Sequence, residues 1–245
     1  MNPWPYPRWI AHRGAGKLAP ENTLAAFRVG AAHGYRMFEC DVKLSADGVP
    51  FLMHDATLQR TTSGHGTGGD RSWSELSMLD AGSWHSRTFA GEPLPTFDNI
   101  ARYCLHNGHL LNIEIKPTPG TAAHTGRVVA QRATELWAQA DTPPLLTSFE
   151  PDALAAARDA APDLPRGLLL DTLPSGWFEA ARQLGCVAIV CNHALWDADT
   201  VARVHAAGMR TLSYTVNDEW AAERLLALGT NGIITDRVDL FSPIG

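Results

Sequence analysis

Two kinds of segment alternate along most of the sequence, and this alternation limits the folds that the chain can adopt. Short apolar runs, most of them rich in Val, Ile and Leu, are separated by longer runs rich in Ala, Leu and Arg. The short runs predict buried strands, and the longer runs predict helices. We predict strands at residues 8–12, 37–44, 110–116, 145–149, 167–171, 187–192, 210–216 and 232–235.

Helices are predicted between most of these strands, at residues 22–33, 96–107, 121–140, 151–161, 175–184, 197–207 and 218–228. Strands and helices that alternate in this way form a parallel sheet covered by helices. About eight such units fit a closed (β/α)8 barrel, the TIM barrel, better than an open doubly wound sheet. We therefore predict one TIM-barrel domain over residues 1–245. An open nucleotide-binding sheet would carry Gly-x-Gly-x-x-Gly in its first turn, where this chain has His-Arg-Gly-Ala-Gly.

One region interrupts the alternation. Asp47-Gly48 is a strong hairpin signal, and residues 49–54 should return antiparallel to the preceding strand. Residues 56–94 are rich in Gly, Ser, Thr and Trp and have no clear period. We expect a small insertion or lid at about residues 45–95, after the second barrel strand, rather than a separate domain.

Acidic residues occur in two predicted barrel strands, whose carboxyl ends carry the reactive groups in this type of fold. Glu39 and Asp41 lie two residues apart, so both point to one face, and Glu114 lies in the next barrel strand. Carboxylates that converge in a barrel mouth repel each other unless a cation lies between them. Oxygen ligands favour one divalent cation, Mg²⁺ or Ca²⁺, with Mn²⁺ as a further candidate. The alternative is surface ion pairs of Glu39 with Lys43 and of Glu114 with Lys116.

Basic residues and histidines are predicted at the same mouth. Arg13 and Lys116 could bind a phosphate ester beside the cation, or could simply neutralise neighbouring carboxylates. His12 and His54 would reach the mouth from the first strand and from the hairpin. One histidine at a strand end is usually structural, but two beside a metal cluster favour an acid/base pair.

Composition and charge exclude several kinds of partner. The chain has 20 Lys and Arg against 26 Asp and Glu, a net charge of −6, which disfavours nucleic-acid binding. No apolar stretch approaches the roughly 20 residues that cross a bilayer, and the start lacks the apolar core of a signal peptide. The four cysteines lack metal-site spacing, which favours free thiols in the cytoplasm. We expect no stable membrane anchor, and a monomer or homodimer.

Taken together, these motifs make the sequence resemble the short bacterial members of the glycerophosphodiester phosphodiesterase family. The resemblance runs nearly end to end. It rests on AHRGAGKLAPENTLAAF (11–27), FECDVKLSADGVPFLMHDATLQRTT (38–62), LDAGSW (79–84), LPTFDN (94–99), LNIEIKP (111–117), LLTSF (145–149), YTVN (214–217) and GIITDR (232–237).

The resemblance implies a TIM barrel with an insertion and a role for each candidate residue. The metal ligands would be Glu39, Asp41 and Glu114, the acid/base pair His12 and His54, the phosphate ligands Arg13 and Lys116, and the other substrate contacts Phe149 and Tyr214. Glu21 would orient these groups, and Asn22 would begin the following helix. Family members usually have Trp where this chain has Tyr214, which bears on the preferred alcohol.

The expected reaction is metal-dependent hydrolysis of a small glycerophosphodiester to sn-glycerol 3-phosphate and an alcohol. Three alternatives remain open at this point. They are a lysophospholipase D-type phosphodiesterase, a sugar-phosphate isomerase or aldolase on the same barrel, and a phosphate-binding protein without catalysis. An isomerase or aldolase would act without metal and would not cleave phosphodiesters.

Overall fold

The sheet closes into a barrel. The computed structural model describes residues 4–243. Within that range β1 pairs in parallel with both β2 and β9, and the strands between them pair in chain order, which confirms the (β/α)8 prediction. The parallel strands are β1 (Trp9–Ala11), β2 (Met37–Leu44), β4 (Leu110–Ile115), β5 (Leu145–Ser148), β6 (Arg166–Leu170), β7 (Ala188–Asn192), β8 (Arg210–Tyr214) and β9 (Gly232–Thr235).

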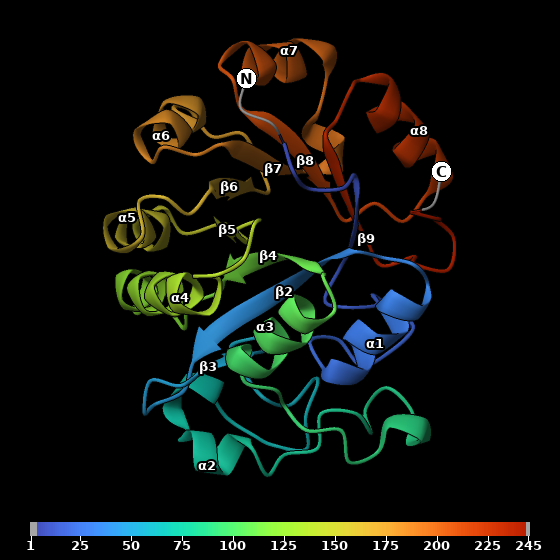
Figure 1. Cartoon of the computed structure of the whole chain (residues 1–245), viewed down its shortest axis with the longest axis vertical. Helices are drawn as coiled ribbons and strands as arrows, with labels where there is room; N and C mark the ends of the chain where they lie inside the picture. The colour runs from blue at the N-terminus through green and yellow to red at the C-terminus, as the bar shows by residue number, and fades with distance from the viewer. Residues whose placement is uncertain (1–3, 244–245) are drawn as a thin grey trace.

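Helices surround the ring of strands (Figure 1). Those that follow barrel strands are α1 (Leu24–Ala32), α3 (Phe97–His106), α4 (Ala122–Leu136), α5 (Pro151–Ala160), α6 (Trp177–Gln183), α7 (Ala198–Ala206) and α8 (Glu219–Ala227). A single-turn helix, η3 (His193–Leu195), follows β7. Among the described residues, no helix has both the length and the apolar character that a membrane span requires.

Residues between β2 and α3 leave the barrel. Strand β3 (Pro50–Leu52) pairs antiparallel with β2, and the turn between them contains Gly48 at a φ of 79°. The rest contains η1 (Gly68–Asp70), α2 (Trp73–Leu76) and η2 (Arg87–Phe89). Phe51, Met53, Leu58, Leu76, Ala81 and Leu94 form a separate small core. Figure 1 shows this segment, in teal and green, beyond α1 and α3.

The barrel interior is apolar except toward the carboxyl ends of the strands. Ile10, Met37, Leu145, Ala188 and Leu212 belong to a fully buried cluster contributed by the strands. Burying a large apolar side chain such as Ile10 or Leu145 contributes about 1.5–3 kcal/mol to folding. Tyr6, just before β1, joins this cluster and donates a hydrogen bond to the carbonyl of Pro143, so the described residues ahead of β1 cover the amino end of the barrel.

A close contact between α4 and α5 gives a prediction. A Cβ added to Gly126 in α4 would lie 2.1 Å from the carbonyl oxygen of Ala153 in α5. Gly126→Ala gains about 1 kcal/mol of helix propensity but should lose more by overpacking, which costs about 1–3 kcal/mol. We expect a lower midpoint in thermal denaturation. The control compares Arg127→Ala with Arg127→Gly at the exposed neighbouring position, and their difference in stability gives the contribution of helix propensity alone. A Gly126→Ala variant more stable than wild type would contradict the close contact.

Candidate active site

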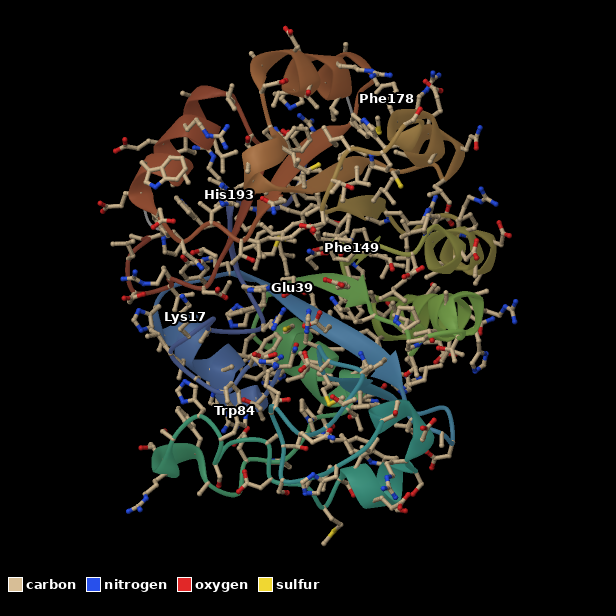
Figure 2. All side chains as sticks on the ribbon, turned by 180° about the vertical axis from the view of Figure 1, so that it is seen from behind. Lys17, Glu39, Trp84, Phe149, Phe178 and His193 are labelled. Carbon is tan, nitrogen blue, oxygen red and sulfur yellow. The ribbon has the colours of Figure 1, made fainter. Side chains whose placement is uncertain are left out.

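A cavity of about 320 Å³ opens among the carboxyl ends of the strands. Figure 2 shows two of its residues, Glu39 and Phe149, near the centre of the ring. Predicted site residues that line it are His12, Arg13, Glu39, His54, Glu114, Lys116, Phe149 and Tyr214. The other two predicted residues, Asp41 and Glu21, do not line the cavity, but both form ion pairs with Arg13, which does. The structure therefore brings all ten residues to one place.

Three carboxylates converge from two adjacent strands. Glu39 and Asp41 lie on the same face of β2, and the register of the sheet puts Asp41 beside Glu114 of β4. One oxygen from each carboxylate lies within 4.8 Å of the others. All three residues are at least nine-tenths buried, so water screens their repulsion poorly.

Burial and this repulsion raise the pKa values of two of these carboxyl groups, those of Glu39 and Glu114. Burial, with the neighbouring Asp41 and Glu114, holds the pKa of Glu39 well above its ordinary value. Burial and Asp41 raise the pKa of Glu114 to about 7. Burial also acts to raise the pKa of Asp41, but positive charge, that of Arg13 first, and the hydrogen bond from Asn22 hold it below its ordinary value.

The carboxylates have acceptor capacity that the protein leaves unused. Among the described residues, Oε1 of Glu39 and Oδ1 of Asp41 are buried without a hydrogen-bond donor. Buried charged oxygens without donors are costly. A divalent cation that prefers oxygen ligands would satisfy both atoms and relieve the repulsion. The donor set therefore fits Mg²⁺, Ca²⁺ or Mn²⁺ rather than a metal that prefers sulfur or nitrogen.

The alternative of surface ion pairs is wrong for Lys43. Its ammonium is buried and donates to the carbonyls of Met53, His54 and Lys116 at 3.0–3.2 Å, which ties β2 to the two segments that carry His54 and Lys116. Burial lowers the pKa of Lys43 to about 8. Lys116 does pair with Glu114, Nζ to Oε1 at 2.8 Å, but inside the mouth rather than on the surface.

Arg13 and Asn22 both adopt left-handed backbone conformations, with φ values of 52° and 59°. The backbone N–H of Arg13 donates to Oε2 of Glu39, and its guanidinium donates to Glu21. The amide of Asn22 donates to Oδ2 of Asp41 and accepts from the Asp41 backbone N–H. The prediction that Asn22 begins the helix is therefore wrong, because Thr23 is the N-cap of α1 and Asn22 holds a carboxylate.

His12 is held by a carboxylate from the loop that follows the last strand, β9. Its Nδ1 lies 2.6 Å from Oδ1 of Asp236, and because a carboxylate only accepts, the ring nitrogen donates. The side-chain amide of Asn217 donates to the other oxygen of Asp236. Gly16 makes this approach possible, since a Cβ there would lie 2.2 Å from the Asp236 Cα. The other ring nitrogen of His12, Nε2, lies 3.8 Å from Oε2 of Glu39.

His54 is held differently. Its Nδ1 lies 2.8 Å from Oδ1 of Asp55. Arg60 of the insertion donates to both oxygens of Asp55 and to both oxygens of Glu21. Burial lowers the pKa of His54, which favours the neutral ring. The insertion thus fixes His54 through Arg60 and Asp55, and the same Arg60 binds the insertion to Glu21 in the loop after β1.

Sequence reasoning missed the supporting residues. Asp55 and Asp236 were recognisable as polar residues at the mouth, but their pairing with the two histidines depends on side-chain direction. Arg60 lies in a segment with no periodic pattern, so only its position in the family motif could have indicated it. The Asn22 signal was available, because Asn is the residue after Gly that most readily adopts positive φ.

The buried carboxylates lead to a prediction about stability. Saturating Mg²⁺, Mn²⁺ or Ca²⁺ should raise the thermal midpoint of the protein, since binding at 100 times the Kd stabilises by about 2.7 kcal/mol. Glu39→Gln should lose most of this shift. After EDTA treatment it should be at least as stable as wild type, because one repelling charge is gone.

Glu223→Gln, an exposed change on α8, is the matched control and should keep the full shift. Denaturation followed by circular dichroism, with and without the cation, checks both variants. An equal cation-dependent shift in Glu39→Gln would show that the cation binds elsewhere.

Comparisons with known proteins identify the family of this chain. Residues 12–240 match the glycerophosphoryl diester phosphodiesterase family. A glycerophosphodiester phosphodiesterase of Caldanaerobacter subterraneus is 32% identical over 232 residues, 93% of each chain. The Bacillus subtilis protein YhdW is 30% identical over 237 residues, 94% of each chain.

Solved structures show the same fold. A phosphodiesterase from Oleispira antarctica, solved in complex with the product sn-glycerol 3-phosphate, superposes with a TM-score of 0.90 at 35% identity, over 97% of this chain and 96% of that one. A glycerophosphodiester phosphodiesterase from Agrobacterium tumefaciens gives 0.79 at 29% identity, over 98% of this chain and all of that one. The chain therefore belongs to the glycerophosphoryl diester phosphodiesterase family of phosphoric diester hydrolases.

Proposed function

We propose that the protein hydrolyses small glycerophosphodiesters to sn-glycerol 3-phosphate and an alcohol, using a divalent cation and two histidines. The observation that carries this proposal is the pairing of each cavity histidine with a carboxylate beside a buried acidic triad. The Oleispira antarctica relative supports the product, since its structure was solved with sn-glycerol 3-phosphate.

Arg13 and Lys116 bind the phosphate in this proposal. Nε of Arg13 is buried without a hydrogen bond among the described residues, although it lies 3.3 Å from Asp41. Lys116 reaches into the same cavity from the end of β4, with its ammonium 2.8 Å from Glu114. A planar guanidinium and a point charge together stabilise the negative charge that develops on phosphate oxygens.

A cation held by Glu39, Asp41 and Glu114 would supply Lewis-acid stabilisation of that negative charge when bound. The protein's own part is to keep the ligands fixed. Asn22 holds Asp41, the Arg13 backbone holds Glu39, and Lys116 holds Glu114. The three carboxylates are thus arranged before any ligand arrives, which reduces the cost of reorganisation.

His12 and His54 transfer the protons. Donation from Nδ1 to Asp236 or Asp55 fixes the tautomer in which Nε2 can accept a proton. One ring removes a proton from the nucleophile, and the other protonates the oxygen of the departing alcohol as its bond to phosphorus breaks. The nucleophile is either water, or the glycerol 2-hydroxyl, in which case water then opens the cyclic phosphate to give sn-glycerol 3-phosphate. The two partners differ, because Arg60 neutralises Asp55 whereas the neutral amide of Asn217 holds Asp236.

We further place the protein in a reducing compartment, the cytoplasm. The support is that Cys40, Cys104, Cys186 and Cys191 are all free and buried. Exported proteins more often pair their cysteines as disulfides.

The reaction itself is tested with one assay. We expect release of sn-glycerol 3-phosphate from glycerophosphocholine, glycerophosphoethanolamine or glycerophosphoglycerol in the presence of Mg²⁺, Mn²⁺ or Ca²⁺, and loss of release with EDTA. A coupled dehydrogenase assay for glycerol 3-phosphate measures it. No release from any of these diesters with any of these cations would reject the proposed function.

The histidine roles are tested by substitution. His12→Ala and His54→Ala should each lower kcat by at least ~100-fold, the scale of a lost general acid or base. Asp236→Asn should lower kcat with little change in KM, because it disturbs only the orientation of the ring. His106→Ala, an exposed change at the end of α3, is the control. If both cavity variants turned over at the control rate, the acid/base assignment would be wrong.

A further inference from the structure

The cavity has two unlike halves. Its charged metal and phosphate groups come from β1, β2, β4 and the hairpin. The opposite wall comes from β5, β6 and β8, and contains Phe149, Leu169, Asp171 and Tyr214. Asp171 is the one charged side chain that lines the cavity from this second wall, among the residues that the structure describes.

Asp171 has no cationic partner. It follows the last residue of β6, and its Oδ1 accepts one hydrogen bond, from the amide of Asn192 at 3.2 Å. Within residues 4–243, no Lys, Arg or His lies within ion-pair distance of it. Glu21 and Asp55, by contrast, are both paired with Arg60. The second wall therefore presents an uncompensated negative charge to the cavity.

Two aromatic rings lie between this charge and the phosphate end. Phe149 and Tyr214 meet edge to face, with ring centroids 5.7 Å apart. The Tyr214 hydroxyl donates to the carbonyl of Leu170, the residue before Asp171, so the ring is fixed beside that carboxylate. Nζ of Lys116 lies 5.3 Å from the Phe149 ring centre, so a ring of this wall already contacts the charge of one cation from the protein itself. Aromatic faces and an unpaired carboxylate together attract a cation.

We propose that this second wall, Phe149, Tyr214 and Asp171, is the alcohol subsite, and that it selects a positively charged aminoalcohol ester. The inference rests on the proposed function, because the phosphate must lie near Arg13 and Lys116. The alcohol then extends past Phe149 toward Asp171. A two-carbon bridge separates the phosphate oxygen from the ammonium group in choline and ethanolamine esters, whereas glycerol and inositol esters offer only neutral hydroxyls.

The test compares two substrates on several variants. The measured quantity is the ratio of kcat/KM for glycerophosphocholine to kcat/KM for glycerophosphoglycerol, with a saturating concentration of whichever cation among Mg²⁺, Mn²⁺ and Ca²⁺ gives the highest turnover. Asp171→Asn should lower this ratio by about 5-fold, the upper end of what an exposed charge contact contributes. Asp171→Lys should lower it further. Asp199→Asn, which removes one exposed charge from neighbouring α7 outside the cavity, should leave the ratio as in wild type.

The outcomes separate the inference from the proposed function. Ratios within twofold of wild type in both Asp171 variants would overturn the alcohol subsite, while turnover itself would keep the proposed function. A ratio that falls equally in Asp199→Asn would also overturn it, because long-range charge would then be the cause. No turnover of either ester by the wild-type protein with any of Mg²⁺, Mn²⁺ and Ca²⁺ would reject the proposed function, and the inference with it.

Discussion

Mutual repulsion among Glu39, Asp41 and Glu114 is the constraint that organises the site. These carboxylates are nearly inaccessible to water and have ligand oxygens within 4.8 Å of one another. Such an arrangement is stable only where cations and donors surround it. Arg13, Asn22 and Lys116 supply part of that compensation, and two oxygens remain without donors. The remaining deficit is the physical reason to assign a divalent cation to this place.

The barrel makes that convergence possible. Adjacent parallel strands put Asp41 and Glu114 side by side, and the loops after β1 and β9 bring His12 and Asp236 together across the closure of the sheet. The insertion contributes the other half, because Arg60 fixes Asp55 and hence His54. One histidine is thus held by the barrel and the other by the insertion, so under the proposed function the position of the insertion bears on catalysis as well as on packing.

Much of the architecture followed from sequence because strand and helix periods are local properties. The strand at 232–235 was predicted to the residue, and the two-residue spacing of Glu39 and Asp41 placed both on one face. Side-chain partners were harder, since direction depends on backbone angles and on distant segments. Asn22 was predicted to begin a helix, because Asn is favoured both at helix starts and at positive φ, and the residue type alone does not separate the two. Lys43 was considered as a surface partner of Glu39, yet three backbone carbonyls bind it.

The central claim is that a divalent cation binds to Glu39, Asp41 and Glu114, next to a phosphate bound by Arg13 and Lys116. Crystals grown with Mn²⁺ and sn-glycerol 3-phosphate, measured at a wavelength where Mn²⁺ scatters anomalously, test this directly. The account predicts one strong anomalous peak among Glu39, Asp41 and Glu114, with the phosphate in contact with Arg13 and Lys116. An anomalous peak at another position, or a phosphate bound away from both basic residues, would contradict it.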